Sequence, residues 1–171
     1  MTEFELIERV FRPLDGGRDD VAVGIGDDAA VVQIPPGHEL VACVDTLVAG
    51  VHFPVDCSPF DIGWRAGATN LSDLAAMGAE PRWATLALTL PQAEPQWLSA
   101  FAEGLAAVLR PWRVALVGGD TTRGPLNICV QAMGEVPRGR ALTRAGARAG
   151  GGLWVSGTLG DAALALAALT K

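Results

Sequence analysis

The hydrophobic and polar positions of the chain follow two periods, and each period predicts one kind of element. Short apolar runs between turn residues predict strands at residues 21–25, 31–34, 39–47, 82–90, 114–117, 126–133 and 153–156. Apolar residues spaced three and four positions apart predict helices at residues 4–11, 59–77, 95–110 and from 161 onward. This order indicates an α/β or α+β layer fold, in which a mixed sheet is flanked by helices.

Capping residues place the ends of two of these helices. Thr2 followed by Glu5 has the spacing of a capping box, and Pro13 limits the helix that it begins. Ser58 is suited to the N-cap of the second helix, and Gly78 is suited to its end.

The amino-acid composition of the sequence changes after Pro137. Arginines are scattered there among glycines and alanines, which is typical of a connection between domains. The remaining residues supply only one strand and one helix, too little for a core of their own. We therefore expect one domain at residues 1–137, and a linker with the first strand and helix of a second domain at residues 138–171.

Composition excludes several kinds of chemistry. The chain has 171 residues with a formal net charge of −6, and its only lysine is Lys171. A Walker A loop and Schiff-base chemistry both need a lysine at the site, so neither is expected. The acidic balance also argues against a nucleic-acid partner, because such proteins carry a clustered basic surface.

The cysteines and the chain start favour a reducing compartment. The three cysteines show no CxxC spacing, and the acidic start does not read as a secretory leader. The apolar runs are shorter than the roughly 18 residues of a membrane span. The expected location is the cytoplasm, with no membrane partner.

Five aspartates interrupt apolar segments: Asp27, Asp28, Asp45, Asp73 and Asp120. A carboxylate near a buried strand end is costly unless it is paired or bound to a metal. If several converge, their oxygen-only ligand set favours Mg²⁺, which usually binds together with substrate phosphates. In the simpler alternative, each aspartate caps a helix or turn.

The segment GGDTTRG, residues 118–124, is the second candidate element. Its glycines permit close backbone approach, and Asp120 offers a metal ligand. Arg123 or Arg144 could neutralise phosphate charge in place of a lysine. The alternative is an ordinary turn between two strands. His52, beside the strand that carries Asp45, is suited equally to a substrate contact and to a structural hydrogen bond.

Five segments of the chain form a distinctive set in a fixed order: GIGDDAAVV, VDTLVAGVHF, NLSDLAAMGAEPRWATLALTLP, LVGGDTTRGPLNICVQAMGEVP and RALTRAGARAG. Together they resemble the thiamine-monophosphate kinase family, within the aminoimidazole-ribonucleotide-synthetase-like superfamily. The resemblance implies an enzyme that transfers the γ-phosphate of ATP to thiamine monophosphate, giving thiamine diphosphate. It also implies that residues 1–137 are the superfamily's N-terminal ATP-binding domain, a nucleotide- and Mg-binding domain whose sheets join across a homodimer.

The resemblance also implies roles for individual residues. Mg²⁺ would be held by Asp28, Asp45, Asp73 and Asp120. ATP would contact Gly119, Asp120 and Arg144, and thiamine monophosphate would contact His52. Asp27 would orient its neighbour. No general base is expected, because the attacking phosphate oxygen is already ionised at neutral pH.

The chain departs from the family pattern in three places. Cys43 and Val44 stand where the family has hydroxyl residues, and residues 149–151 read Ala-Gly-Gly where Pro-Gly-Asp is usual. The family also has a second domain, about as long again, that carries a further metal-binding aspartate. Two alternatives therefore stay open: a Mg-ATP-binding and dimerisation module without turnover, or another ATP-using enzyme of the superfamily.

Overall fold

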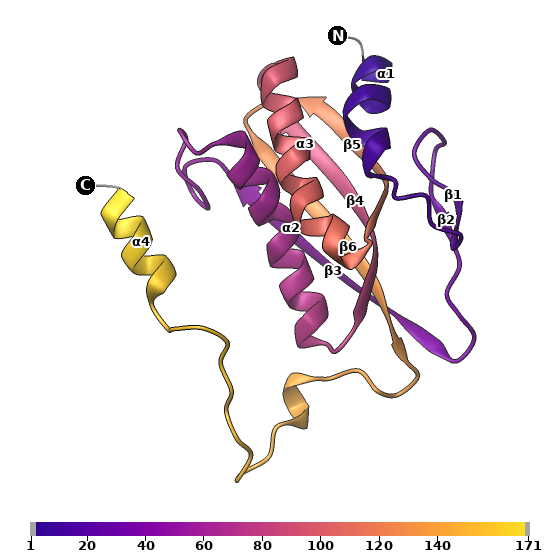
Figure 1. The fold of residues 1–171 in the computed structure, drawn as a ribbon, viewed down its shortest axis with the longest axis vertical. Coiled ribbons are helices and arrows are strands. Elements are labelled where there is room, and N and C mark those ends of the chain that lie inside the picture. The colour runs from indigo at the N-terminus through magenta and orange to yellow at the C-terminus, as the bar shows by residue number, and fades with distance from the viewer. Residues whose placement is uncertain (1–2, 170–171) are drawn as a thin grey trace.

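A four-stranded mixed sheet organises the chain, of which the computed structural model describes residues 3–169 (Figure 1). The strands are β3 (His38–Val48), β4 (Glu80–Leu90), β5 (Ala115–Arg123) and β6 (Asn127–Pro137). Their order is β3-β6-β4-β5, with β6 antiparallel to both neighbours and β4 parallel to β5. The predicted mixed sheet is confirmed.

Two helices, α2 (Pro59–Ala76) and α3 (Pro95–Leu109), cover one face of this sheet (Figure 1). Alternation along the strands directs Leu86, Leu88 and Val130 into the core beneath them. The helices approach closely where Gly104 faces Phe60, since a Cβ at Gly104 would lie 1.9 Å from the Phe60 carbonyl oxygen. The residues between β4 and β5 thus form a crossover that the parallel pair requires.

The predicted ends of α2 are confirmed. The Ser58 hydroxyl accepts a hydrogen bond from the Asp61 amide at 3.1 Å, and Gly78 follows the helix with φ of +68°. The first helix forms as α1 (Glu3–Leu6), a π turn over Ile7–Phe11 and a 3₁₀ turn over Arg12–Leu14, so helical turns continue through Pro13. Thr2, the expected first cap, lies outside the described residues.

A small antiparallel ribbon covers part of the sheet's other face. It consists of β1 (Val21–Val23) and β2 (Val31–Val32), shorter than predicted, and it packs with Trp83. On the same face, beyond this ribbon, β3 exposes Leu40 and Val44. This face is therefore only partly covered in the described chain.

Two predictions about strands are wrong. The expected strand at residues 153–156 does not form: Leu153 is 100% exposed and Trp154 94% exposed, with no described strand beside them. An isolated strand has nothing to pair its backbone with, so it is not stable. Helix α4 (Asp161–Leu169) forms as expected, at the end of the extended segment that follows β6 (Figure 1).

The second error concerns the GGDTTRG segment, which is not a loop. Strand β5 continues through residues 118–123, each paired in parallel with β4. The two strands meet closely at Gly119, because a Cβ there would lie 2.0 Å from the Leu86 carbonyl oxygen. Gly119 therefore serves strand packing and not a turn.

None of the helices within residues 3–169 combines the length and apolar character that a bilayer crossing requires.

Candidate active site

A cavity of about 430 Å³ lies between the N-terminal helical segment, the loop around residues 25–28 and strand β5. Asp27, Asp28, Gly119 and Asp120 all line it, and we call it the aspartate cavity. Three residues that were expected to act together, Asp28, Gly119 and Asp120, are therefore brought into one place.

Strand geometry explains how β5 presents this wall. Gly119 pairs with Leu86, and Asp120 pairs with Ala87. Because Leu86 faces the helices, alternation places Asp120 on the opposite face of the sheet, where it is exposed. The close approach of β4 at Gly119 leaves no room for a side chain there, so Gly119 lines the cavity with its backbone, next to Asp120.

The opposite wall is held by short-range contacts. The Asp27 carboxylate accepts a hydrogen bond from the Asp28 amide at 2.8 Å, which fixes the loop next to Asp28. Gly26 has φ of +117°, and a Cβ there would lie 2.7 Å from Nη2 of Arg12. The positive φ favours glycine at this position, since the flexible Arg12 side chain alone could move aside.

Arg12 and Glu8 are cavity residues that sequence reasoning missed. Arg12 donates to both carboxylate oxygens of Glu8, with Nε at 2.7 and 2.8 Å. These hydrogen bonds hold the pKa of Glu8 below its ordinary value and raise that of Arg12. Glu8 and Arg12 are four residues apart on a helical segment, a spacing that favours ion pairs. This spacing is the feature of the sequence from which the pair could have been predicted. Arg12 adds one cation to a cavity otherwise rich in carboxylates.

Asp45 and Asp73 form a separate group around Cys43. The Cys43 thiol donates weakly to the Asn70 carbonyl oxygen at 3.4 Å and to Oδ1 of Asn70 at 3.6 Å. Partial burial raises the pKa of this thiol, and the charges of Asp73 and Asp45 raise it further. The two aspartates therefore share an electrostatic neighbourhood, but neither lines the aspartate cavity.

The strand order explains this separation. The pairing register aligns Asp45, Val130, Leu86 and Gly119 in one row across the sheet. Three inter-strand spacings of about 4.8 Å put the ends of that row about 14 Å apart. Mg²⁺ bonds are only about 2.1 Å long, so one ion cannot join both groups. Accordingly, the described residues contain no group of three or more His, Cys, Asp and Glu side chains placed to hold a metal.

The residues of the aspartate cavity nevertheless fit the oxygen chemistry of Mg²⁺. Asp28 and Asp120 in the aspartate cavity give two carboxylates, and Thr121 adds a hydroxyl-bearing residue. One or two protein carboxylates, completed by water and phosphate, are the usual set for this ion.

His52 and Arg144 lie away from the aspartate cavity. His52 follows β3, and its Nδ1 accepts a hydrogen bond from the Val48 amide at 3.0 Å. The exposed Nε2 then carries the proton in the neutral ring. Arg144 begins a 3₁₀ turn, Arg144–Gly146, in the exposed segment after β6. The structure does not bring these two residues to the aspartates.

The family follows from a match over the strands that build the site. Residues 26–136 match the model described as AIR synthase related protein, N-terminal domain. The chain belongs to the AIR synthase related family. The matched part begins in the loop of the aspartate cavity and runs through the strands of the large sheet, so the family relationship covers the loop and the β5 wall of the cavity but not its N-terminal helical wall.

Known members of this family extend the comparison. The thiamine-monophosphate kinase of Salmonella typhimurium (strain LT2) is 52% identical over 167 residues, which are 98% of this chain and 51% of the relative. The crystal structure of thiamine-monophosphate kinase from Stenotrophomonas maltophilia K279a matches with a TM-score of 0.89 and 55% identity, over 99% of this chain and 54% of that one. The resemblance to thiamine-monophosphate kinases is thereby confirmed.

A third match concerns a structure with ligands. AaThiL complexed with AMPPCP and TMP has a TM-score of 0.72 and 35% identity, over 99% of this chain and 53% of that one. The chain spans about half the length of the curated relatives that it matches. What the AIR synthase related domain does within a longer protein is therefore a matter for proposal.

Proposed function

We propose that the chain is the N-terminal, nucleotide-binding part of a thiamine-monophosphate kinase, a phosphotransferase that converts ATP and thiamine monophosphate to ADP and thiamine diphosphate. The observation that carries this proposal is the convergence of Asp28, Gly119 and Asp120 on one cavity. The similarity to AaThiL, whose structure holds AMPPCP and TMP, supports the choice of substrates.

The protein's own contribution is positioning. Asp28 and Asp120 would hold Mg²⁺ at the nucleotide, with the Asp27 carboxylate fixing the amide of Asp28. Asp45 and Asp73 would hold Mg²⁺ separately, in keeping with the distance between the two groups. The metal supplies charge neutralisation between anionic phosphates.

The remaining roles complete the binding of the two substrates. Arg144 would bind ATP phosphates, and the free Nε2 of His52 would contact thiamine monophosphate. No side chain needs to remove a proton, because the attacking phosphate oxygen is ionised at neutral pH.

We also propose a homodimer in which sheets join. Strand β3 is at one edge of the sheet, and it exposes Leu40 by 47% and Val44 by 60% on the face away from the helices. An edge strand with exposed apolar residues is suited to pairing with a second copy. Light scattering after size exclusion would give twice the monomer mass; a monomer at all concentrations would contradict this arrangement.

Two further expectations belong to the proposal. The boundary between residues 1–137 and 138–171 fits the change from paired strand to exposed segment after Pro137. All three cysteines are free thiols, as is usual in the reducing cytoplasm, which stays the expected location.

Product formation tests the proposed reaction. Purified protein is supplied with ATP, Mg²⁺ and thiamine monophosphate, and ADP and thiamine diphosphate are measured. Equal amounts of both products support the kinase. Since the chain spans half of its relatives, Mg-dependent ATP binding without product would favour the binding module instead. Failure of ATP to bind with Mg²⁺ present would overturn both.

A further inference from the structure

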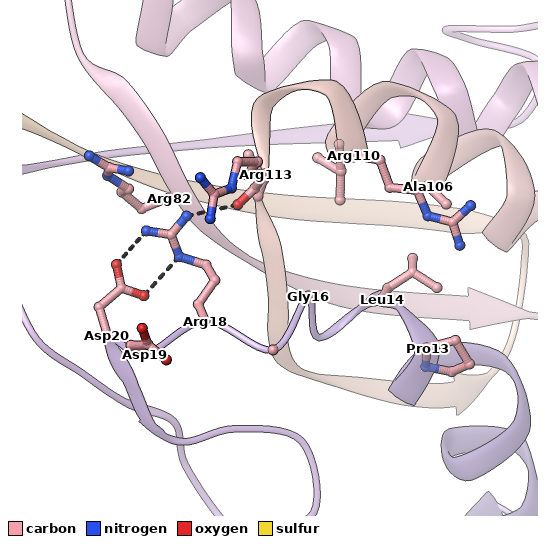
Figure 2. Close-up of a pocket in the computed structure, with 13 residues that line it drawn as sticks. Pro13, Leu14, Gly16, Arg18, Asp19, Asp20, Arg82, Ala106, Arg110 and Arg113 are labelled. Atoms are coloured by element: carbon pink, nitrogen blue, oxygen red, sulfur yellow. Dashed lines mark hydrogen bonds and ion pairs between the residues drawn. The ribbon is translucent and has the colours of Figure 1, made fainter.

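A second cavity of about 430 Å³ is lined by several arginines and shares no lining residue with the aspartate cavity. Four of the chain's twelve arginines line it: Arg18, Arg82, Arg110 and Arg113. We call it the arginine cavity. Figure 2 shows Arg18, Arg82 and Arg113 together at one end and Arg110 toward the other, beside Leu14. In a chain of net charge −6, this is a local concentration of positive charge.

Two of these arginines form ion pairs within the protein. Arg18 makes a two-pronged ion pair with Asp20, and its Nη1 donates to the Arg113 carbonyl oxygen at 2.9 Å (Figure 2). Arg82 donates to Oε1 of Glu135 from Nε at 3.0 Å and from Nη2 at 2.7 Å. These guanidinium charges are balanced within the protein.

The side chains of Arg110 and Arg113 have no ion-pair or hydrogen-bond partner in the described part of the chain. Among residues 3–169, no carboxylate forms an ion pair with either guanidinium, and neither side chain makes a hydrogen bond. Asp19 also lines the cavity, so its free charge is two arginines against one exposed aspartate. A guanidinium that faces a cavity without a partner is suited to a phosphate, which it binds through two parallel hydrogen bonds.

The backbone at Arg113 supports a role in binding. Arg113 ends a 3₁₀ turn, Arg110–Trp112, with φ of +55°, and it is the only described non-glycine residue with positive φ. Glycine is the usual residue at such a helix end, because a side chain there costs conformational energy. Backbone strain of this kind concentrates at functional sites. At this position the left-handed backbone places the Arg113 side chain at the arginine cavity. A glycine would fit the same backbone but would supply no guanidinium to the cavity.

The geometry points to the arginine cavity as a binding site for a small phosphorylated molecule, held by Arg110 and Arg113 and distinct from the aspartate cavity. The volume is in the range of small-ligand sites. Apolar contacts from Leu14 and Leu109 would take the uncharged part of the ligand. Since two guanidiniums without a partner line the same cavity, a ligand with two phosphoryl groups binds more tightly than one with a single group.

The test measures inorganic phosphate and pyrophosphate binding by calorimetry, with EDTA present so that no metal assists the aspartate cavity. The protein should bind pyrophosphate saturably with Kd below about 1 mM, and phosphate more weakly. Arg110→Gln and Arg113→Gln should each weaken pyrophosphate binding at least fivefold. The matched control is Arg65→Gln, which removes the same charge from an exposed site on α2 outside both cavities and should leave Kd unchanged.

A glycine variant separates binding from folding. Arg113→Gly relieves the positive φ, so its melting temperature should equal or exceed that of the parent chain while pyrophosphate binding is lost. Three results would overturn the inference: no saturable binding to the parent chain, equal weakening by Arg65→Gln, or tighter binding of malonate than of pyrophosphate, which would assign the cavity to carboxylates. Retained binding in Arg113→Gly would remove Arg113 from the site.

Discussion

A methyl group at Gly119 would collide with the neighbouring strand at the wall of the aspartate cavity. The added Cβ would lie 2.0 Å from the Leu86 carbonyl oxygen, 2.9 Å from its carbonyl carbon and 3.1 Å from its amide nitrogen. All three atoms are backbone, so no side chain can turn away. Reaching the shortest distance that real Cβ atoms show moves β5 away from β4 by about 1 Å.

The expected cost of Gly119→Ala follows from this displacement. Overpacking costs about 1–3 kcal/mol, and weakening one hydrogen bond of the β4–β5 ladder adds about 1 kcal/mol. A total of about 2–4 kcal/mol lowers the melting temperature of a chain of this size by about 5–15 °C. Because the same strand carries Asp120, Mg-ATP affinity should fall at least tenfold.

The neighbouring glycine gives a matched control. A Cβ at Gly118 would meet no atom within 4 Å, and Gly118 does not have positive φ. Gly118→Ala should therefore melt within about 2 °C of the parent chain or slightly above it, since alanine has less freedom to lose than glycine on folding. Calorimetric melting and Mg-ATP titration of both variants are the assays. Equal melting temperatures and equal affinities would refute the close approach of β4 and β5.

Three further substitutions test the site and the fold. Asp120→Asn should weaken Mg-ATP binding at least tenfold in a titration, whereas Asp56→Asn, on an exposed loop outside the cavity, should not. His52→Ala should raise KM for thiamine monophosphate with KM for ATP unchanged; equal increases would point to a structural role through its hydrogen bond from the Val48 amide. The Arg18 hydrogen bond lowers the pKa of Asp20 below that of the unfolded chain, so this stabilisation is present above about pH 3.9 and is lost as pH falls through the folded-state pKa. Asp20→Asn should therefore lower the urea midpoint at pH 7 more than at pH 3, and equal losses at both would contradict that.

Local sequence signals predicted most elements of the fold. The Ser58 cap, the apolar spacing of α2 and α3, and the strand runs all rest on neighbouring residues, and the structure confirms them except for the run at residues 153–156. The extent of β5 was missed because Gly-Gly-Asp also suits a turn. Only the contact with Leu86, more than 30 residues earlier in the chain, decides between the two.

The arrangement of the site depends still more on contacts between distant segments. Asp28 and Asp120 share a cavity because β5 is an edge strand beside the N-terminal segment. Asp45 stands apart because β6, the last strand in the described part of the chain, inserts between β3 and β4. Composition and spacing contain no information on that insertion. The sequence therefore indicated which residues carry charge, and strand order determines which of them meet.

The length of β5 also keeps the charges of the two cavities apart. Arg113 precedes β5, and Asp120 lies in its second half. The strand from residue 115 to residue 120 alone spans about 16 Å at about 3.3 Å per residue. This exceeds the Debye length of about 8 Å at physiological ionic strength, so a charge change at one cavity is largely screened at the other. Substitutions at Arg113 and Asp120 should consequently combine additively in Mg-ATP affinity, within about 0.5 kcal/mol. A larger coupling energy in the double mutant would mean that β5 transmits a displacement from one cavity to the other.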